Sequence, residues 1–231
     1  MIEEEPINFS LFVAQSIASV KMKMTIIIIG GFLGSGKTLT IISLSQKMST
    51  EFNKKVAVVV NEIGEVAVDA KIIQEYGLKV KEIGGGCICC QLLVDLKTTI
   101  LTLYSLFKPD IIFIEPTGIA TVKSIKDNVV SLRSKEFDMT AGPSVVLFDA
   151  LRARELLDDE LLEDPDYIVV KQLREADVVA INKIDVADEE TLKWCEEMIR
   201  KINANATLIR ISALKGYGLS ELLGFLLKSS S

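Results

Sequence analysis

Gly31-Phe-Leu-Gly-Ser-Gly-Lys-Thr38 is a glycine-rich turn that ends in lysine and threonine. An apolar run, Thr25–Ile29, comes directly before it, and a segment with helical spacing, Lys37–Met48, follows. The turn fits G-x-x-x-x-G-K-[ST], which forms a phosphate-binding loop when a strand precedes it and a helix follows. Its backbone N–H groups then point at one anion near the positive end of the helix. The sequence therefore predicts a nucleotide phosphate site.

The residues of this loop have distinct expected tasks. The glycines allow the tight backbone, the Lys37 ammonium reaches the β- and γ-phosphates, and the Thr38 hydroxyl binds Mg²⁺. The expected nucleotide contacts of the loop are Gly31, Gly34, Ser35, Gly36, Lys37, Thr38 and Leu39.

Apolar, β-branched runs recur along the chain, and longer stretches with helical spacing follow them. The expected strands are Thr25–Ile29, Val56–Val60, Ile111–Ile114, Ser144–Phe148, Val178–Ile181 and Thr207–Ile211. The expected helices are Lys37–Met48, Leu92–Leu106, Ile119–Leu132, Glu189–Ile202 and Ser220–Leu227. Continuous apolar strands alternating with helices are typical of a sheet covered on both faces. The sequence predicts an α/β fold, a three-layer P-loop NTPase domain with a mostly parallel central sheet flanked by helices.

A chain of 231 residues with 49% apolar and 25% charged residues suits one globular domain. We expect that domain at residues 24–228, after a helical N-terminal accessory segment at 1–23 and before a tail at 229–231. The net charge of −6 with scattered basic residues argues against a nucleic-acid partner. The acidic N-terminus and interrupted apolar stretch behind it favour neither a signal peptide nor a membrane span, so we expect a cytoplasmic protein. We interpret the acidic, leucine-rich segment 152–171 as a mobile or partner-facing insertion.

Glu115-Pro-Thr-Gly118 follows the expected strand Ile111–Ile114, at the sheet edge where the phosphate loop also lies. We expect Glu115 to be the Walker-B-like acid of the Mg²⁺ site, beside the Thr38 hydroxyl. The backbone N–H of Gly118 is placed to contact the γ-phosphate, as switch loops do. The expected catalytic residues are Lys37, Glu62 and Glu115, and Glu62, Glu65 or Asp69 orients the attacking water. No arginine is evident in this site, which favours slow hydrolysis stimulated by a partner or by dimerisation.

Asn182-Lys-Ile-Asp185 follows the strand Val178–Ile181, and Ser212-Ala-Leu-Lys-Gly216 follows the next strand. The Asp185 carboxylate can accept from the N1 and N2 protons of guanine, a donor pattern that adenine lacks. Asn182 supports the loop and the base O6 or N7, and Lys183 covers the ring face. The backbone of Ser212, Ala213 and Leu214 is placed to donate to O6. GTP or GDP is therefore the expected nucleotide.

Gly84-Gly-Gly-Cys87-Ile-Cys89-Cys90 joins three glycines to three of the four cysteines. Clustered thiolates suit a soft or borderline metal in a reducing compartment. The chain has no histidine, so a carboxylate, water or a partner must complete the set, and Glu62 is the candidate carboxylate. Zn²⁺ is the first expectation, Co²⁺ and Fe²⁺ also fit, and a redox pair or a packed turn of small residues stays open. Cys195, alone on a helical pattern, is expected in the core.

The sequence resembles the CobW-type metallochaperone GTPases, relatives of the nickel-insertion GTPases of hydrogenase and urease. The resemblance runs from about Met24 to Leu227 and rests on the phosphate loop, Asn61-Glu-Ile-Gly-Glu65, Gly86-Cys-Ile-Cys-Cys90 and the two later motifs. It implies a Mg²⁺-dependent GTPase that binds Zn²⁺ or Co²⁺ at Cys87, Cys89 and Cys90, near Glu62, and releases it to a client metalloprotein. It also implies a homodimer. The second domain and histidine-rich stretches of many relatives are not in this sequence, so we expect a separate chain to recognise the client.

Three alternatives stay open. One is a GTPase that activates a metallocofactor enzyme, such as a corrinoid enzyme, without transferring metal. Another is a non-catalytic switch that docks a partner through residues 152–171. The third, a small-molecule kinase, is disfavoured by the guanine-type loop.

Overall fold

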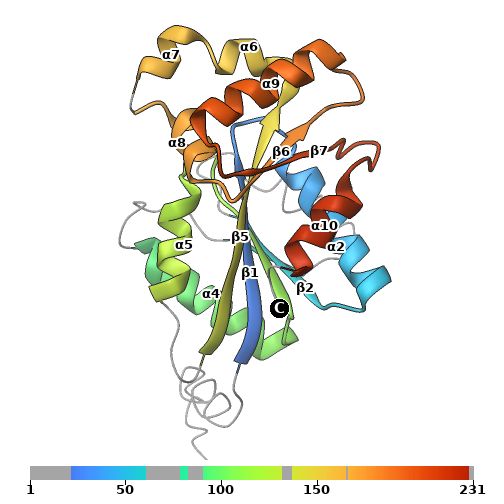
Figure 1. The fold of residues 1–231 in the computed structure, drawn as a ribbon. Helices are drawn as coiled ribbons and strands as arrows, with labels where there is room; N and C mark the ends of the chain where they lie inside the picture. The colour runs from blue at the N-terminus through green and yellow to red at the C-terminus, as the bar shows by residue number, and fades with distance from the viewer. Residues whose placement is uncertain (1–21, 61–78, 83–90, 132–136, 165, 229–231) are drawn as a thin grey trace, which may run out of the picture.

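The computed structural model describes residues 22–60, 79–82, 91–131, 137–164 and 166–228, and these residues form three layers (Figure 1). The strands are β1 (Met22–Gly31), β2 (Val56–Val60), β3 (Lys79–Glu82), β4 (Ile111–Glu115), β5 (Phe137–Asp149), β6 (Val178–Asn182) and β7 (Thr207–Arg210). The helices are α2 (Lys37–Phe52), α4 (Gln91–Phe107), α5 (Val122–Ser131), α6 (Ala153–Leu156), α7 (Asp159–Glu163), α8 (Ile168–Glu175), α9 (Glu189–Ile202) and α10 (Leu219–Lys228), with a 3₁₀ turn η1 (Ala150–Arg152). The described strands form one sheet in the order β3-β2-β4-β1-β5-β6-β7, and every pairing is parallel.

Both faces of this sheet are buried. Ile26 and Ile28 of β1 belong to a core cluster with the apolar faces of α4, α5, α8 and α9. The alternate residues Ile27 and Ile29 belong to a second cluster with α2 and α10. Successive strand side chains point to opposite faces, so a strand covered on both sides must be apolar at every position. The expected three-layer fold is confirmed.

The central strands are longer than their apolar runs. β1 and β5 pair from Met22 with Phe137 to Gly31 with Leu147, and the register shifts between Ile26 and Ile28. Residues 22 and 23, which we assigned to the accessory segment, are thus part of the sheet, whereas residues 1–21 and 229–231 lie outside the described residues. The helix expected from residue 119 begins at residue 122. The edge strand β3 was not predicted, because its sequence Lys-Val-Lys-Glu carries one apolar residue in four.

The segment 152–171 is part of the fold rather than an inserted loop. It forms α6, α7 and the start of α8, and Leu156, Leu157 and Val169 are buried in the first core cluster. The Asp158 side chain accepts a hydrogen bond from the backbone N–H of Glu160 and so caps α7. The interpretation as a mobile insertion is wrong, because its leucines serve the core and one of its acids serves as a helix cap.

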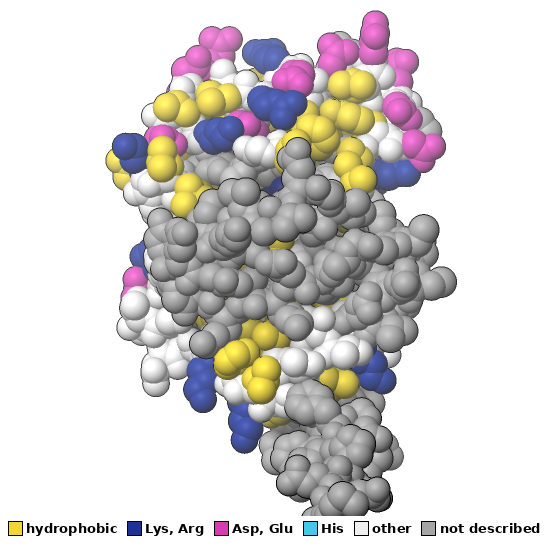
Figure 2. Space-filling view, turned by 180° about the vertical axis from the view of Figure 1, so that it is seen from behind, with side chains coloured by type: hydrophobic (Ala, Val, Ile, Leu, Met, Phe, Trp, Pro, Cys, Tyr) yellow, Lys and Arg dark blue, Asp and Glu magenta, His cyan; other side chains and the backbone are white. Residues whose placement is uncertain are grey.

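Charged side chains of both signs lie among exposed hydrophobic ones at the end of the molecule formed by α6, α7 and α9 (Figure 2). Within the described ranges, no helix has the length and apolar character needed to cross a bilayer.

Asp177 joins α5 and β5 to the start of β6. Its Oδ2 accepts from Lys126 Nζ at 2.7 Å and from Ser144 N and Oγ at 2.7 and 2.8 Å. Burial alone raises the pKa of this carboxyl, but hydrogen bonds from Lys126 and Ser144 outweigh burial and hold the pKa below its usual value. The charged carboxylate therefore stabilises the fold fully above the unfolded-state pKa of about 3.9, and this contribution is lost as the pH falls through the lower, folded-state pKa.

We expect Asp177→Asn to lower the free energy of unfolding by about 1 kcal/mol at neutral pH, allowing for solvent screening of a partly exposed pair. The difference from the unchanged protein should shrink below about pH 4. Denaturant midpoints measured from pH 3 to pH 8 check this, with Asp127→Asn on the exposed face of α5 as the control. A difference that stays constant down to pH 3 would contradict the role of the charge.

Candidate nucleotide site

The phosphate loop lies between the end of β1 and the start of α2. Gly31, Gly34 and Gly36 all have left-handed φ angles, of 134°, 76° and 96°. A Cβ at Gly31 would collide with the backbone oxygen of Leu147 on β5, and one at Gly36 would collide with the Asn182 amide. Only glycine fits these positions, so the loop has the tight backbone that a phosphate cradle requires.

Two polar side chains of this loop lack full hydrogen bonding among the described residues. The Ser35 hydroxyl is buried without a partner there. Lys37 is 8% exposed, and its Nζ donates to the Phe32 carbonyl at the long distance of 3.5 Å. Buried polar groups are normally satisfied, so these two groups fit a site that is completed by an anion.

Thr38 on α2 and Glu115 at the end of β4 meet beside the loop. Thr38 Oγ1 donates to Glu115 Oε1 at 2.9 Å and lies 3.2 Å from Oε2. Glu115 is 4% exposed. A hydroxyl and a carboxylate brought together next to a phosphate cradle form the all-oxygen donor set that Mg²⁺ prefers.

Asn182 at the end of β6 links two loops that are far apart in sequence. Its Nδ2 donates to the Ser35 carbonyl at 2.8 Å, and its Oδ1 accepts from the Ala213 backbone N–H at 3.0 Å. Both ends of the amide are therefore used within the protein. The expected support of the loop by Asn182 is present, and its expected contact with the base stays a prediction, because these two bonds leave one N–H of Nδ2 and one lone pair of Oδ1 available.

Lys183 and Asp185 follow Asn182 in the same turn. Lys183 has a left-handed φ of 71°, and its Nζ lies 2.6 Å from Asp149 Oδ2. Asp149 ends β5, and its side chain is 2% exposed. Its second oxygen accepts from the Leu151 backbone N–H at 3.0 Å. Asp185 is half-buried, and its carboxylate has no hydrogen bond or ion pair with the described residues. The turn therefore holds the lysine in place and leaves Asp185 for a ligand.

The loop after β7 completes this edge. Ser212 pairs with Tyr217 in a short antiparallel bridge, and the Ser212 carbonyl accepts from the Gly216 backbone N–H at 2.8 Å. The Ser212 and Ala213 N–H groups are bonded to Tyr217 and Asn182. Of the three expected donors, this leaves the N–H of Leu214 without a partner in the described part of the chain. Leu214 is therefore the one expected donor of this loop whose N–H stays available among the described residues.

Gly118 lies against the phosphate loop on its other side. A Cβ on Gly118 would lie 3.1 Å from the Leu33 backbone nitrogen. Gln172, a buried residue of α8, donates through Nε2 to the carbonyls of Gly118 at 3.0 Å and Ala120 at 2.8 Å. The sequence analysis missed Gln172, as it missed Asp149, because neither belongs to a motif.

The remaining expected contact, Leu39, is 37% exposed on the first turn of α2. The expected metal residues Glu62, Cys87, Cys89 and Cys90 lie outside the described residues. The described residues contain no group of three or more His, Cys, Asp or Glu side chains suited to a metal ion. Cys195 is buried in the core, as expected, and burial raises the pKa of its thiol to about 11.

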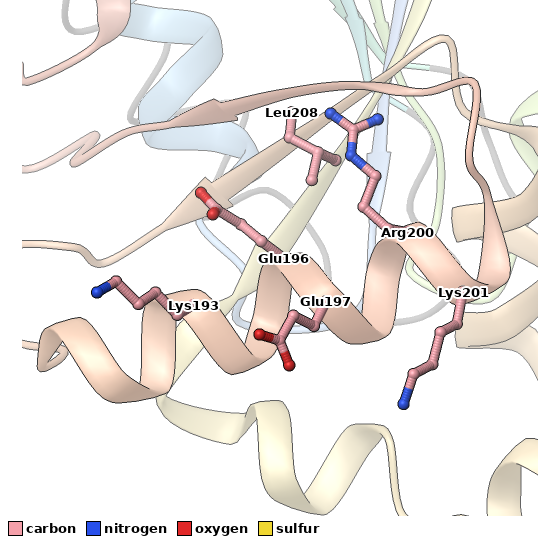
Figure 3. A pocket seen from close by; sticks show the side chains of 6 residues that line it. All are labelled: Lys193, Glu196, Glu197, Arg200, Lys201 and Leu208. Carbon is pink, nitrogen blue, oxygen red and sulfur yellow. The ribbon is translucent and has the colours of Figure 1, made fainter.

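A hollow of about 670 Å³ lies along α9 and β7, away from the phosphate loop (Figure 3). Its lining residues are Lys193, Glu196, Glu197, Arg200, Lys201 and Leu208. Glu196 is paired with Arg210 at 2.6 Å, and Arg200 donates to the Ala206 carbonyl at 2.6 Å. The hollow mixes both signs of charge and contains none of the expected nucleotide contacts, so we assign no ligand to it.

Comparison with solved structures supports the fold. HypB, the hydrogenase maturation factor of Archaeoglobus fulgidus, superposes with a TM-score of 0.61 at 20% identity, over 95% of this chain and 94% of that one. HypB of Helicobacter pylori, solved with nickel, gives 0.64 at 20% identity over 96% and 94%.

Comparison with curated proteins gives nearer relatives in sequence. Zinc chaperone YeiR of Escherichia coli is 36% identical over 165 residues, 71% of this chain and 48% of its own length. Zinc-regulated GTPase metalloprotein activator 1 of Dictyostelium discoideum is 26% identical over 219 residues, 81% of this chain and 46% of its own length. The chain thus spans about half the length of the curated relatives it matches. The model of the CobW/HypB/UreG nucleotide-binding domain matches residues 25–210, and the chain belongs to that family.

Proposed function

We propose that this chain binds GTP, hydrolyses it slowly, and uses the nucleotide to control the binding and release of Zn²⁺ or Co²⁺. The best support for the nucleotide-binding part of this proposal is the Asn182 side chain, which makes one hydrogen bond to each of two loops. It fixes the phosphate loop and the Ser212–Leu214 loop at the same sheet edge. A ligand with phosphates at one end and a base at the other fits such a pair of loops.

Guanine is the base that this edge favours. Asp185 is a carboxylate acceptor without a described partner, and the Leu214 N–H is a donor without one. Guanine offers N1 and N2 protons on one edge and O6 beside them, whereas adenine places a donor where guanine has O6. The stem of Lys183, held by Asp149, covers the ring face.

The residues around the phosphates can hold a triphosphate for hydrolysis with little covalent chemistry of their own. The Lys37 ammonium contacts the β- and γ-phosphates, and the N-terminus of α2 adds favourable potential. Thr38 and Glu115 would hold Mg²⁺, which neutralises charge on the transferring phosphoryl group. The proposed catalytic residues are Lys37, Glu115 and Glu62, and Glu62, Glu65 or Asp69 orients the attacking water.

The metal half of the proposal rests on the cysteine triplet in the sequence and on relatives named zinc chaperones. Cys87, Cys89 and Cys90 bind the ion, and Glu62 adds an oxygen ligand. In this proposal the γ-phosphate holds Gly118 and the 61–69 segment in one arrangement. That arrangement sets the geometry of the three thiolates and so their affinity for the metal. The metal is cargo for a client metalloprotein in the cytoplasm. The chain delivers it as a monomer or a homodimer, and neither nucleic acid nor a membrane is a partner.

The test is a competition titration of metal-free protein with Zn²⁺ and with Co²⁺ against a chelator. It is run in GDP and in a slowly hydrolysed GTP analogue with Mg²⁺. We expect the dissociation constant to differ between the two nucleotides by about 5- to 150-fold, the usual range of coupling between sites. The triple variant Cys87→Ser, Cys89→Ser, Cys90→Ser should lose the site, and Cys195→Ser, which changes a buried core thiol, should keep it. Equal metal affinity in both nucleotide states would contradict the coupling.

A second function has specific support from the name of the Dictyostelium relative, a metalloprotein activator. In that case GTP hydrolysis drives a change in a metallocofactor enzyme and no metal is transferred. Tight GTP binding without a metal site, together with client activation that survives the triple cysteine change, would favour this function.

A further inference from the structure

Arg152 lies beside the phosphate loop although no sequence motif places it there. β5 runs parallel to β1, and Leu147 pairs with Gly31, so the residues that follow β5 emerge next to the loop. Arg152 ends the 3₁₀ turn after β5. Its Nη1 donates to the Leu33 carbonyl at 3.3 Å, and its guanidinium carbon lies 5.4 Å from the centre of the Phe32 ring.

Phe32 and Leu33 also mark the position of the other cation of the site. Lys37 Nζ donates to the Phe32 carbonyl at 3.5 Å, one residue from the carbonyl that Arg152 contacts. The ammonium therefore contacts Phe32, and the guanidinium contacts both Phe32 and the next residue of the loop. Gly118, on the segment after β4, approaches Leu33 as well. The end of the loop where a γ-phosphate would lie is thus bordered by Lys37, Gly118 and Arg152.

The Arg152 guanidinium is held in one orientation, but not all of its N–H donors are engaged in hydrogen bonds. Glu155 binds it in a bidentate manner, with Nε–Oε2 at 3.0 Å and Nη2–Oε1 at 2.6 Å. The hydrogen bond from Arg152 lowers the pKa of the Glu155 carboxyl, so the pair is charged at neutral pH. A guanidinium has five N–H donors. Three are engaged, and two have no partner within the described ranges.

We propose that Arg152 contacts the γ-phosphate of bound GTP and stabilises the charge that develops during its transfer. This inference rests on the proposed GTP site. The present partner of Nη1, the Leu33 carbonyl, is neutral, whereas a phosphate oxygen is charged and binds a guanidinium N–H in a stronger, charge-assisted manner. An arginine near a transferring phosphoryl group acts by electrostatic stabilisation. The chain thus supplies this arginine itself, from the segment between β5 and α6.

The test compares Arg152→Ala with a matched variant, Arg154→Ala. Arg154 is two residues further on, and its guanidinium carbon lies 4.2 Å from the centre of the Trp194 ring. Equilibrium dissociation constants are measured for GDP and for a slowly hydrolysed GTP analogue with Mg²⁺, and single-turnover hydrolysis is followed with GTP. Melting temperatures of the nucleotide-free proteins check that each variant is folded.

For Arg152→Ala we expect the analogue to bind about 10- to 100-fold more weakly while the GDP constant changes less than about twofold, because one charged hydrogen-bond partner of the γ-phosphate is lost. Single-turnover hydrolysis should fall by about 100-fold or more. Arg154→Ala should change neither.

An equal loss of GDP and analogue affinity, or no loss of either, overturns the role of Arg152. A parent protein that binds neither guanine nucleotide refutes the proposed function itself. The two failures are therefore distinguishable.

Discussion

Asp185→Asn should convert the protein from a GTP binder into a binder of xanthosine triphosphate. The carboxylate accepts from the N1 and N2 protons of guanine, and asparagine replaces one of these acceptors with a donor. We expect GTP to bind about 100-fold more weakly or worse, because charged hydrogen bonds are lost and an amide N–H faces the guanine amino group. Xanthine carries an oxygen at position 2, so it pairs with the amide and should bind the variant better than GTP does.

Asp188→Asn is the matched control for this change. Asp188 lies three residues further along, and its side chain accepts from the Thr191 backbone N–H at 2.7 Å to cap α9. Its replacement should leave the preference between guanine and xanthine unchanged. Competition binding between GTP and xanthosine triphosphate gives the comparison for both variants. An Asp185 variant that keeps full GTP affinity would show that another residue recognises the base.

Lys37→Met should have opposite effects on activity and on stability. Removing the ammonium takes away the cation expected at the β- and γ-phosphates, so hydrolysis should fall by about 100- to 1,000-fold. In the nucleotide-free protein, however, Lys37 is a buried charge with one long hydrogen bond to a carbonyl. Methionine has a similar length and no charge to desolvate, so the free energy of unfolding should rise by about 1 kcal/mol.

Lys47→Met on the same helix is the control, because Lys47 is paired with Glu51 on the surface at 3.1 Å. It should leave hydrolysis unchanged and alter stability by less than about 0.5 kcal/mol. Chemical denaturation without nucleotide and single-turnover hydrolysis provide the two readouts. A Lys37 variant that is less stable than the parent would indicate that the lysine serves the fold rather than a phosphate.

The sequence was most informative where the signal is local. A strand buried on both faces is apolar at every position, so β2, β4 and β6 could be read directly from their runs. The phosphate loop could be predicted because its tight backbone requires glycine at fixed positions, whatever the rest of the fold. The helices α6, α7 and α8 were missed because segments of four to eight residues are too short for a helical period to stand out.

The site could be read only in part, because several of its contacts join residues far apart in the chain. Arg152 contacts Leu33 across 119 positions, and Gln172 contacts Gly118 across 54. Neither residue type at those positions signals a partner. The pairing of β5 with β1 brings Arg152 to Leu33, and the position of α8 beside the segment after β4 brings Gln172 to Gly118. The support of the loop by Asn182 was predicted correctly, but its partners Ser35 and Ala213 could not be named from the motif, because they lie far from it in the sequence.

The two hydrogen bonds of the Asn182 side chain also affect the stage of synthesis at which the protein can first hold a ligand. The phosphate loop emerges from the ribosome before both of its anchors, the partner amide at residue 182 and that amide's own partner at Ala213. Domains fold as units as the chain emerges. A nascent chain that has not yet reached Ala213 therefore presents the phosphate loop without these two hydrogen bonds, and we expect it to capture nucleotide only after the loop that follows β7 has emerged.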